Sequence, residues 1–191
     1  PNGILLKSTT QMPSVFPLSF FIYGDDRTIP SIYGRSYIYI LWGPIENVFY
    51  HPRIVIEYYE KGSTVMKTKA VPLYYTTENG VQKGVYPTPT KTNFVSIDTS
   101  VINKALNEIP QNGLDKSNYT ISQIDVQLIV YDENLSTYYT STQESIDSYT
   151  VMLDMPDYSD ITGGYGLFAS YIRTDFYIKF TADYLSAQGY Y

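Results

Sequence analysis

The sequence predicts an all-β protein, a Greek-key β-sandwich that carries one short helix. Two stretches, Tyr37–Tyr59 and Ile121–Tyr131, alternate inward and outward side chains at every second position, which is the pattern of strands packed on a core. About nine short strand-like segments follow one another along the chain, and Gly, Pro, Asn and Asp separate them, as in sandwich folds. A chain of 191 residues suits one large domain.

The stretch Tyr37–Tyr59 gives the strongest strand signal and contains the only tryptophan. Its pattern Y-I-Y-I-L-W places two isoleucines and Trp42 on one face, and alternation resumes at Arg53 after a G-P-I-E-N break. A single large ring at the end of such a strand typically packs between two sheets. Trp42 is therefore predicted to anchor the core.

The other predicted strands follow from the same alternation and from turn residues. In Ile121–Tyr131, every second residue from Ile124 to Val130 is aliphatic and should face the core. The tripeptide Glu78-Asn79-Gly80 predicts a hairpin turn, because Asn-Gly accepts positive φ angles. The remaining predicted strands are Val15–Tyr23, Thr64–Tyr75, Phe94–Ile97, Val151–Met155, Ala169–Ile172 and Phe176–Tyr184.

One helix is expected over Val101–Ile109, with Ser100 as its N-terminal cap and Pro110 just beyond its end. The stretch Leu135–Thr150 is rich in Ser, Thr and Tyr but shows no clear period. It is interpreted as a surface loop or as weak edge strands.

The run Gly163-Gly164-Tyr165-Gly166 is predicted to be a structural bend that lets Leu167 and Phe168 reach the core. Glycine permits positive φ angles and close approach of the backbone. The run is not a phosphate-binding loop, because no Gly-Lys-Ser/Thr follows it. Gly163, Gly164 and Gly166 are therefore structural candidates, together with Trp42.

The composition excludes several classes of protein. The net charge is −6 and no basic run is present, which argues against nucleic-acid binding. No stretch approaches the ~18 apolar residues of a membrane-spanning helix. The lack of cysteine excludes disulfides and thiolate metal sites. Because the chain begins at Pro1 without a signal-like segment, a processed or trimmed product is expected.

No catalytic, cofactor-binding or metal-binding constellation stands out, so neither a cofactor nor an enzymatic activity is expected. His51 is the only histidine; it cannot form a histidine-based zinc site and is interpreted as structural or solvent-facing. The carboxylates of Asp154, Asp157 and Asp160 could ligate calcium, but their spacing matches no EF-hand loop, and turn formation is the favoured interpretation for them and for Asp132–Glu133. A glycosidase-type acid pair would need two carboxylates facing a cleft, and the sequence does not identify such a pair.

Tyrosine is the compositional outlier, with 22 Tyr against 8 Phe and 1 Trp. Its ring packs on a half-buried strand face while its hydroxyl reaches water or a carbonyl. Exposed tyrosines also suit sugar or protein recognition, and the adjacent pairs in the chain offer Tyr58, Tyr74 and Tyr138 as ligand-contacting candidates. Neighbours on a strand point to opposite faces, so one Tyr of each pair can serve a given platform.

Two parts of the chain resemble known proteins. Tyr37–Tyr59 is similar to the Trp-bearing strand pair of immunoglobulin- and fibronectin type III-like domains. Ile124–Tyr139 and Pro156–Ser170 resemble a family of uncharacterised Bacteroidetes envelope lipoproteins, whose members carry a hydrophobic strand, an L-S-T-Y element and a later P-x-[YF]-[ST]-[ND]-I-x-x-G-x-G-[IL]-F element. Members place Asn where this chain has Asp160.

The resemblance implies a non-catalytic interaction module of an outer-membrane lipoprotein in the cell envelope, periplasmic or surface-exposed. It implies a lipobox cysteine and a first domain before Pro1, so that membrane contact is made only through an upstream lipid anchor. Residues 1–30 would be the end of an upstream domain or the first strands, and residues 31–191 a sandwich with a C-terminal extension. The expected partner is another envelope protein in a surface assembly. The alternative is a glycan-binding module that uses exposed tyrosines.

Overall fold

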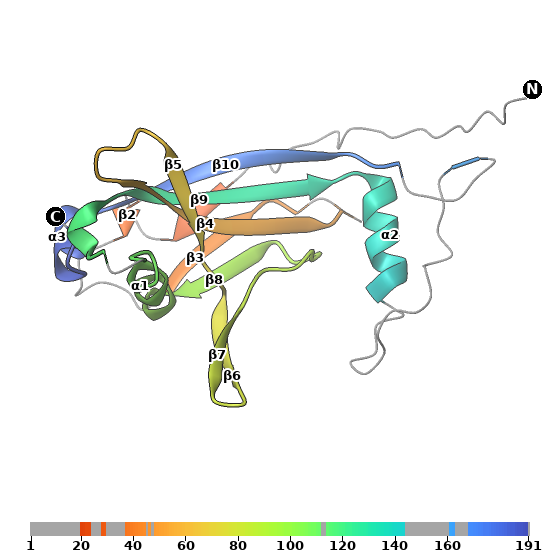
Figure 1. Cartoon of the computed structure of the whole chain (residues 1–191). Coiled ribbons are helices and arrows are strands. Elements are labelled where there is room, and N and C mark those ends of the chain that lie inside the picture. Colours follow the sequence, from red (N-terminus) through yellow and green to blue (C-terminus); the bar gives the residue numbers. More distant parts are fainter. Residues whose placement is uncertain are drawn as a thin grey trace, which may run out of the picture.

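A computed structural model describes residues 20–23, 28–29, 37–44, 46, 48–111, 114–143, 161–162 and 168–190 of the chain. This part contains ten β-strands and three α-helices (Figure 1). The bend glycines Gly163, Gly164 and Gly166 and the predicted strand Val151–Met155 lie outside the described residues. Of the described helices, none combines the length and the apolar character needed to cross a membrane.

The described fold is mostly β and its sheets are mostly antiparallel, which confirms the predicted all-β class. The larger sheet has the order β2-β10-β9-β4-β5 and the second has the order β1-β3-β8, while β6 and β7 form a separate hairpin. β2 and β10 are the one parallel pair among the strands described. In chain order the strands are β1 (Phe20–Tyr23), β2 (Thr28–Ile29), β3 (Tyr37–Trp42), β4 (Tyr50–Glu60), β5 (Met66–Ala70), β6 (Tyr74–Glu78), β7 (Val81–Val85), β8 (Phe94–Asp98), β9 (Tyr119–Tyr131) and β10 (Tyr171–Phe180).

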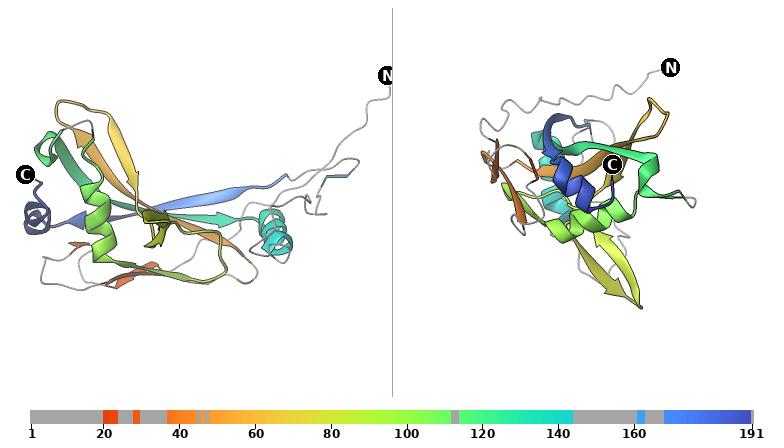
Figure 2. Two further views of the ribbon diagram at one scale, coloured as in Figure 1. Left: turned by 60° about the horizontal axis from the view of Figure 1, so that its bottom comes forward. Right: turned by 90° about the vertical axis from the view of Figure 1, so that its left-hand side faces the viewer.

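The two strands around Trp42 lie in different sheets instead of pairing with each other. β3 is the middle strand of the three-stranded sheet, whereas β4 pairs with β5 and β9 in the larger sheet. The connection between them therefore carries the chain from one sheet to the other, and the two sheets lie on either side of a shared core (Figure 2).

Trp42 lies in that core, as predicted. Its side chain is 2 % exposed, and its ring centroid lies 5.5 Å from that of Tyr50, the first residue of β4. The ring contact thus joins the three-stranded sheet to the five-stranded sheet. From β9, the four predicted inward residues are each 1 % exposed and complete the centre of the core: Ile124, Val126, Leu128 and Val130.

The predicted helix is α1 (Thr99–Asn107), but its cap is Asp98 and not Ser100. The Asp98 carboxylate accepts a hydrogen bond from the Ser100 backbone N–H at 2.7 Å. Ser100 instead lies within the first turn. The buried side of α1 covers one end of the core with Val101, Ile102, Ala105 and Leu106.

The expectation of one helix was wrong, because α2 (Glu133–Gln143) and α3 (Ala182–Ala187) are also present. α2 replaces the loop or edge strands expected from Leu135, and α3 replaces the end of the strand expected to reach Tyr184. Tertiary contacts explain α2: the Asp132 carboxylate accepts the Leu135 N–H at 2.8 Å, and the Ser136 hydroxyl accepts the Phe49 N–H at 3.2 Å. The periodicity of a sequence does not reveal contacts of this kind, because they come from tertiary packing.

The outer face of the five-stranded sheet carries carboxylates that are unusually well covered. Glu57 is 6 % exposed and Asp125 is 3 % exposed. One Asp125 oxygen accepts from the Gln127 amide at 2.7 Å, while the other is buried with no hydrogen-bond partner. Burial raises the pKa of Asp125, and the nearby charges of Asp175 and Glu57 raise it further.

Replacing Trp42 by alanine should lower the free energy of unfolding by about 3–5 kcal/mol, because it leaves a cavity between the two sheets. Urea unfolding followed by far-ultraviolet circular dichroism would measure the change. Tyr39→Ala on the same strand is the control: Tyr39 is 43 % exposed, and its loss should cost less than about 1 kcal/mol. Equal losses for the two variants would show that Trp42 does not anchor the core.

Candidate functional site

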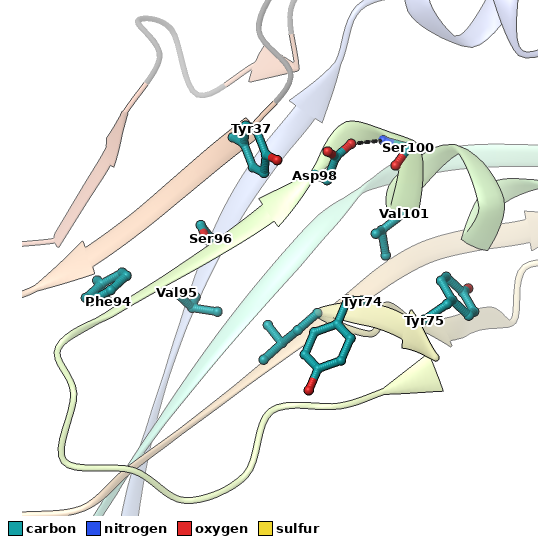
Figure 3. A pocket seen from close by; sticks show the side chains of 10 residues that line it. Tyr37, Tyr74, Tyr75, Phe94, Val95, Ser96, Asp98, Ser100 and Val101 are labelled. Atoms are coloured by element: carbon teal, nitrogen blue, oxygen red, sulfur yellow. Dashed lines mark hydrogen bonds between the residues drawn. The ribbon is translucent and has the colours of Figure 1, made fainter. Parts of the chain in front are cut away.

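A cleft of about 670 Å³ lies beside strand β8, between the three-stranded sheet and the β6–β7 hairpin (Figure 3). Its size is in the range of ligand-binding pockets. Four short segments line it: β3, β8, the start of α1, and the chain that enters β6. The lining residues are Tyr37, Leu73, Tyr74, Tyr75, Phe94, Val95, Ser96, Asp98, Ser100 and Val101.

Three large rings of the cleft are open to solvent. Tyr37 is 46 % exposed, Tyr74 is 53 % exposed and Phe94 is 53 % exposed. Tyr37 and Phe94 stand on the outer face of their sheet, because their neighbours on each strand point into the core. Tyr74 comes from the hairpin on the other side of the cleft. Half-exposed aromatic rings around one hollow are typical of a binding surface.

The hairpin wall is held in place by its turn and by contacts with α1. Asn79 and Gly80 have φ angles of 51° and 78°, as the predicted Asn-Gly turn requires. The Tyr75 hydroxyl donates to Glu108 at 3.3 Å, and Lys104 Nζ lies 3.7 Å from the centre of the Tyr75 ring. Burial and the Glu108 charge raise the pKa of Tyr75 to about 12, so its hydroxyl keeps its proton at neutral pH.

Asp98 gives the cleft its charge: of the ten lining residues, it is the one that is charged at neutral pH. Hydrogen bonds from the Ser100 backbone and side chain, and from the Tyr37 side chain, lower the pKa of Asp98. The carboxylate therefore stays ionised as it caps α1. The site combines apolar rings with one fixed negative charge.

The three tyrosines predicted to contact a ligand do not come together. Tyr74 lies in the cleft, whereas Tyr138 is on α2, beside the Tyr139 ring at 5.7 Å. Tyr58 is 8 % exposed and its ring packs 5.9 Å from that of Tyr119. The prediction of Tyr58 as an exposed ligand-contacting ring was wrong for this structure, because β4 is buried on both faces over much of its length.

Of the ten lining residues, sequence reasoning named Tyr74 as a ligand-contacting candidate and missed the other two exposed rings, Tyr37 and Phe94, and the charged Asp98. The alternation in Tyr37–Trp42 already places Tyr37 on the face opposite Trp42, which is the outer face of the sheet. Nothing in the sequence shows that β8 lies at a sheet edge beside a hairpin. That arrangement follows from tertiary packing.

His51 has a structural role, which was one of the two interpretations of this residue, structural or solvent-facing. Its Nε2 lies 3.1 Å from the Pro87 carbonyl, which can only accept, so Nε2 carries a hydrogen and donates. Its Nδ1 lies 3.0 Å from the Tyr131 hydroxyl. Burial lowers the pKa of His51 despite the Pro87 contact, which by itself raises it.

Within the described residues, no group of three or more His, Asp and Glu side chains is arranged to hold a metal ion. Asp132 instead joins the end of β9 to the chain before β10, because its second oxygen accepts the Ser170 backbone N–H at 2.6 Å. The carboxylates of Asp154–Asp160 lie outside the described residues. Comparison with protein families gives no matching family model, and no curated protein or solved structure is significantly similar to the chain.

The stability of the protein should depend on His51 as the pH is lowered. The pKa of folded His51 lies below the ordinary value of 6.5, so the unfolded chain takes up a proton first as the pH falls. The contribution of His51 to stability is therefore lost as the pH drops below about 6.5. The free energy of unfolding of the wild type should therefore fall relative to His51→Gln between pH 7.5 and 5. Titration of this single histidine by NMR should give a midpoint below 6.5, and a midpoint at or above 6.5 would contradict the prediction.

Asp98→Ala should lower the free energy of unfolding by about 1 kcal/mol, because the first turn of α1 loses its cap. Asp98→Asn should retain most of the stability, since an amide oxygen also accepts the Ser100 N–H. Urea unfolding of the two variants measures the difference. If both variants lost the same amount, the charge of Asp98 and not its capping bond would be the stabilising feature.

Proposed function

We propose that this chain is a non-catalytic interaction module of an outer-membrane lipoprotein, and that it acts as a subunit of, or an accessory to, a surface protein assembly. The cleft beside β8 is the proposed contact surface. The observation that carries the proposal is the set of three half-exposed rings, Tyr37, Tyr74 and Phe94, around a hollow at a sheet edge. Aromatic residues are enriched where protein partners bind.

The proposal includes the immunoglobulin- or fibronectin type III-like Greek-key arrangement of the sheets. It is supported by β3 and β4, consecutive strands that lie in opposite sheets with the Trp42 ring between them. The envelope location and the lipid anchor rest on the resemblance of Ile124–Tyr139 and Pro156–Ser170 to envelope lipoproteins.

Glycan binding is the second candidate, because Tyr37 and Tyr74 line the same cleft as the Asp98 carboxylate. Sugar faces stack on such rings while their hydroxyls bond to carboxylates. The neighbouring Tyr39 ring does not line the cleft and does not extend it as a flat platform, because it is tilted by 35° from the Tyr37 ring with centroids 6.2 Å apart. A flat platform for a sugar chain needs rings closer to coplanar.

The proposal is tested by placing a photo-crosslinking phenylalanine analogue at Phe94 or Tyr74 of the full-length protein in its native cells. Both positions should give a discrete protein adduct, because both rings line the cleft. The matched control is Val65, which is 65 % exposed and lies outside the cleft.

The same adduct pattern at Phe94 and Val65 would contradict the proposed contact surface. An adduct at Phe94 that resists protease but is released by glycosidases would favour the glycan candidate. Recovery of the adduct in the membrane fraction tests the envelope location, and its absence there would contradict it.

A further inference from the structure

One edge of β8 carries backbone hydrogen-bonding groups that no strand in the described part of the chain takes up. β8 pairs with β3 on one side, and no described strand pairs with its other side. The Trp42 N–H donates to the Asn93 carbonyl at 3.0 Å. In an antiparallel pair, only every second residue exchanges backbone hydrogen bonds with the partner strand. Counted from Asn93, the β8 residues that bond to β3 are therefore Val95 and Ile97. The N–H and C=O of Phe94 and Ser96 therefore point away from β3.

The cleft surrounds that edge on both faces of the sheet. Val95 belongs to the inner face and lies toward Tyr74 across the cleft, whereas Phe94 and Ser96 belong to the outer face (Figure 3). The hairpin forms a second wall opposite the edge. An extended chain laid along β8 would have side chains that contact both faces alternately.

The side-chain chemistry of the cleft defines what such a chain would carry. One row of its side chains would meet Leu73, Val95 and Val101, which are apolar. The other row would meet two rings and the Asp98 carboxylate. Because Asp98 supplies the only charge among the lining residues, an arginine or lysine in that row would be complementary to the site. The five residues of β8 span about 16 Å at ~3.3 Å per residue.

We propose that β8 binds an extended peptide segment of a partner protein as a fourth strand of the three-stranded sheet, with a basic side chain directed to Asp98 and apolar side chains on the opposite face. Strand addition at a sheet edge is a general mode of peptide recognition. This inference rests on the proposed function, because it names the kind of partner segment that the cleft receives.

The probe is a phage-displayed library of random nine-residue peptides, selected on the full chain. Enriched peptides should share a basic residue with apolar residues at alternate positions. A synthetic peptide from the enriched set should slow hydrogen exchange at the Phe94 and Ser96 amides, because those amides gain acceptors. No slowing at these two amides in the wild-type protein would overturn the proposal.

Ser96→Pro removes one outward N–H and leaves the bonds to β3 intact, since that N–H does not bond to β3. The peptide dissociation constant should rise at least tenfold. Thr68→Pro is the matched control, because β5 is also a sheet edge. The hydrogen bond from the Val71 N–H to the Ile54 carbonyl sets the pairing of β5 with β4, so the Thr68 N–H points away from β4. This variant should bind within twofold of wild type. Equal weakening by both variants, or by neither, would overturn the proposal.

The role of Asp98 is tested with Asp98→Asn, which keeps the helix cap. It should weaken a basic peptide about threefold, in line with an exposed ion pair, and leave its Arg→Gln analogue unchanged. If Asp98→Asn bound the basic peptide as tightly as the wild type does, the assignment of a basic side chain would be overturned.

The outcomes separate this inference from the proposed function. If crosslinking from Phe94 matches that from Val65, the contact surface itself is wrong. If Phe94 crosslinks to a protein but Ser96→Pro binds peptide normally, only strand addition is wrong. Sedimentation that shows a dimer for wild type and a monomer for Ser96→Pro would assign the edge to a second copy of this chain and overturn the partner peptide.

Discussion

Strand β9 hydrogen-bonds to β4 along one side and to β10 along the other, and these two pairings fix the register of the larger sheet. The inward side of β9 is an unbroken aliphatic row from Ile124 to Val130. A shift of one residue would turn that row to the outer face and bring Asp125 into the core. The same register sets Tyr50 against the Trp42 ring, which positions β3, and through β3 the edge strand β8. The cleft is thus a distant consequence of how β9 pairs.

Much of this framework could be predicted from local patterns. The period-two rows in Tyr37–Trp42 and Ile121–Tyr131 located β3 and β9 because burial of one face imposes alternation. Trp42 was correctly placed in the core for the same reason. The Asn79-Gly80 turn was predictable because few residue pairs accept two positive φ angles. These features depend on neighbours in the sequence.

The features that were not predicted depend on residues far away in the chain. α2 lacks an apolar stripe, and its position is set by the hydrogen bonds of Asp132 to Ser170 and of Phe49 to Ser136. Tyr58 was taken for a ligand-contacting ring because it stands in an adjacent pair of tyrosines, yet its ring is buried against Tyr119. The cleft is assembled from segments far apart in the sequence, so only Tyr74 of its rings was identified as a candidate.

The order of strands also has a consequence for how the chain folds. β10 follows its partner β9 in the sequence and is separated from it by α2 and by more than twenty further residues. Until Tyr171–Phe180 has been made and has docked, one edge of β9 stays unpaired, although this strand is long and rich in Ile, Val and Leu. Unpaired edges of this kind recruit other chains. β2 can dock only after β10, because Thr28 pairs with Lys179. Completion of the larger sheet therefore waits for the last strand, and a nascent chain that stalls before Tyr171 would be prone to aggregate through β9.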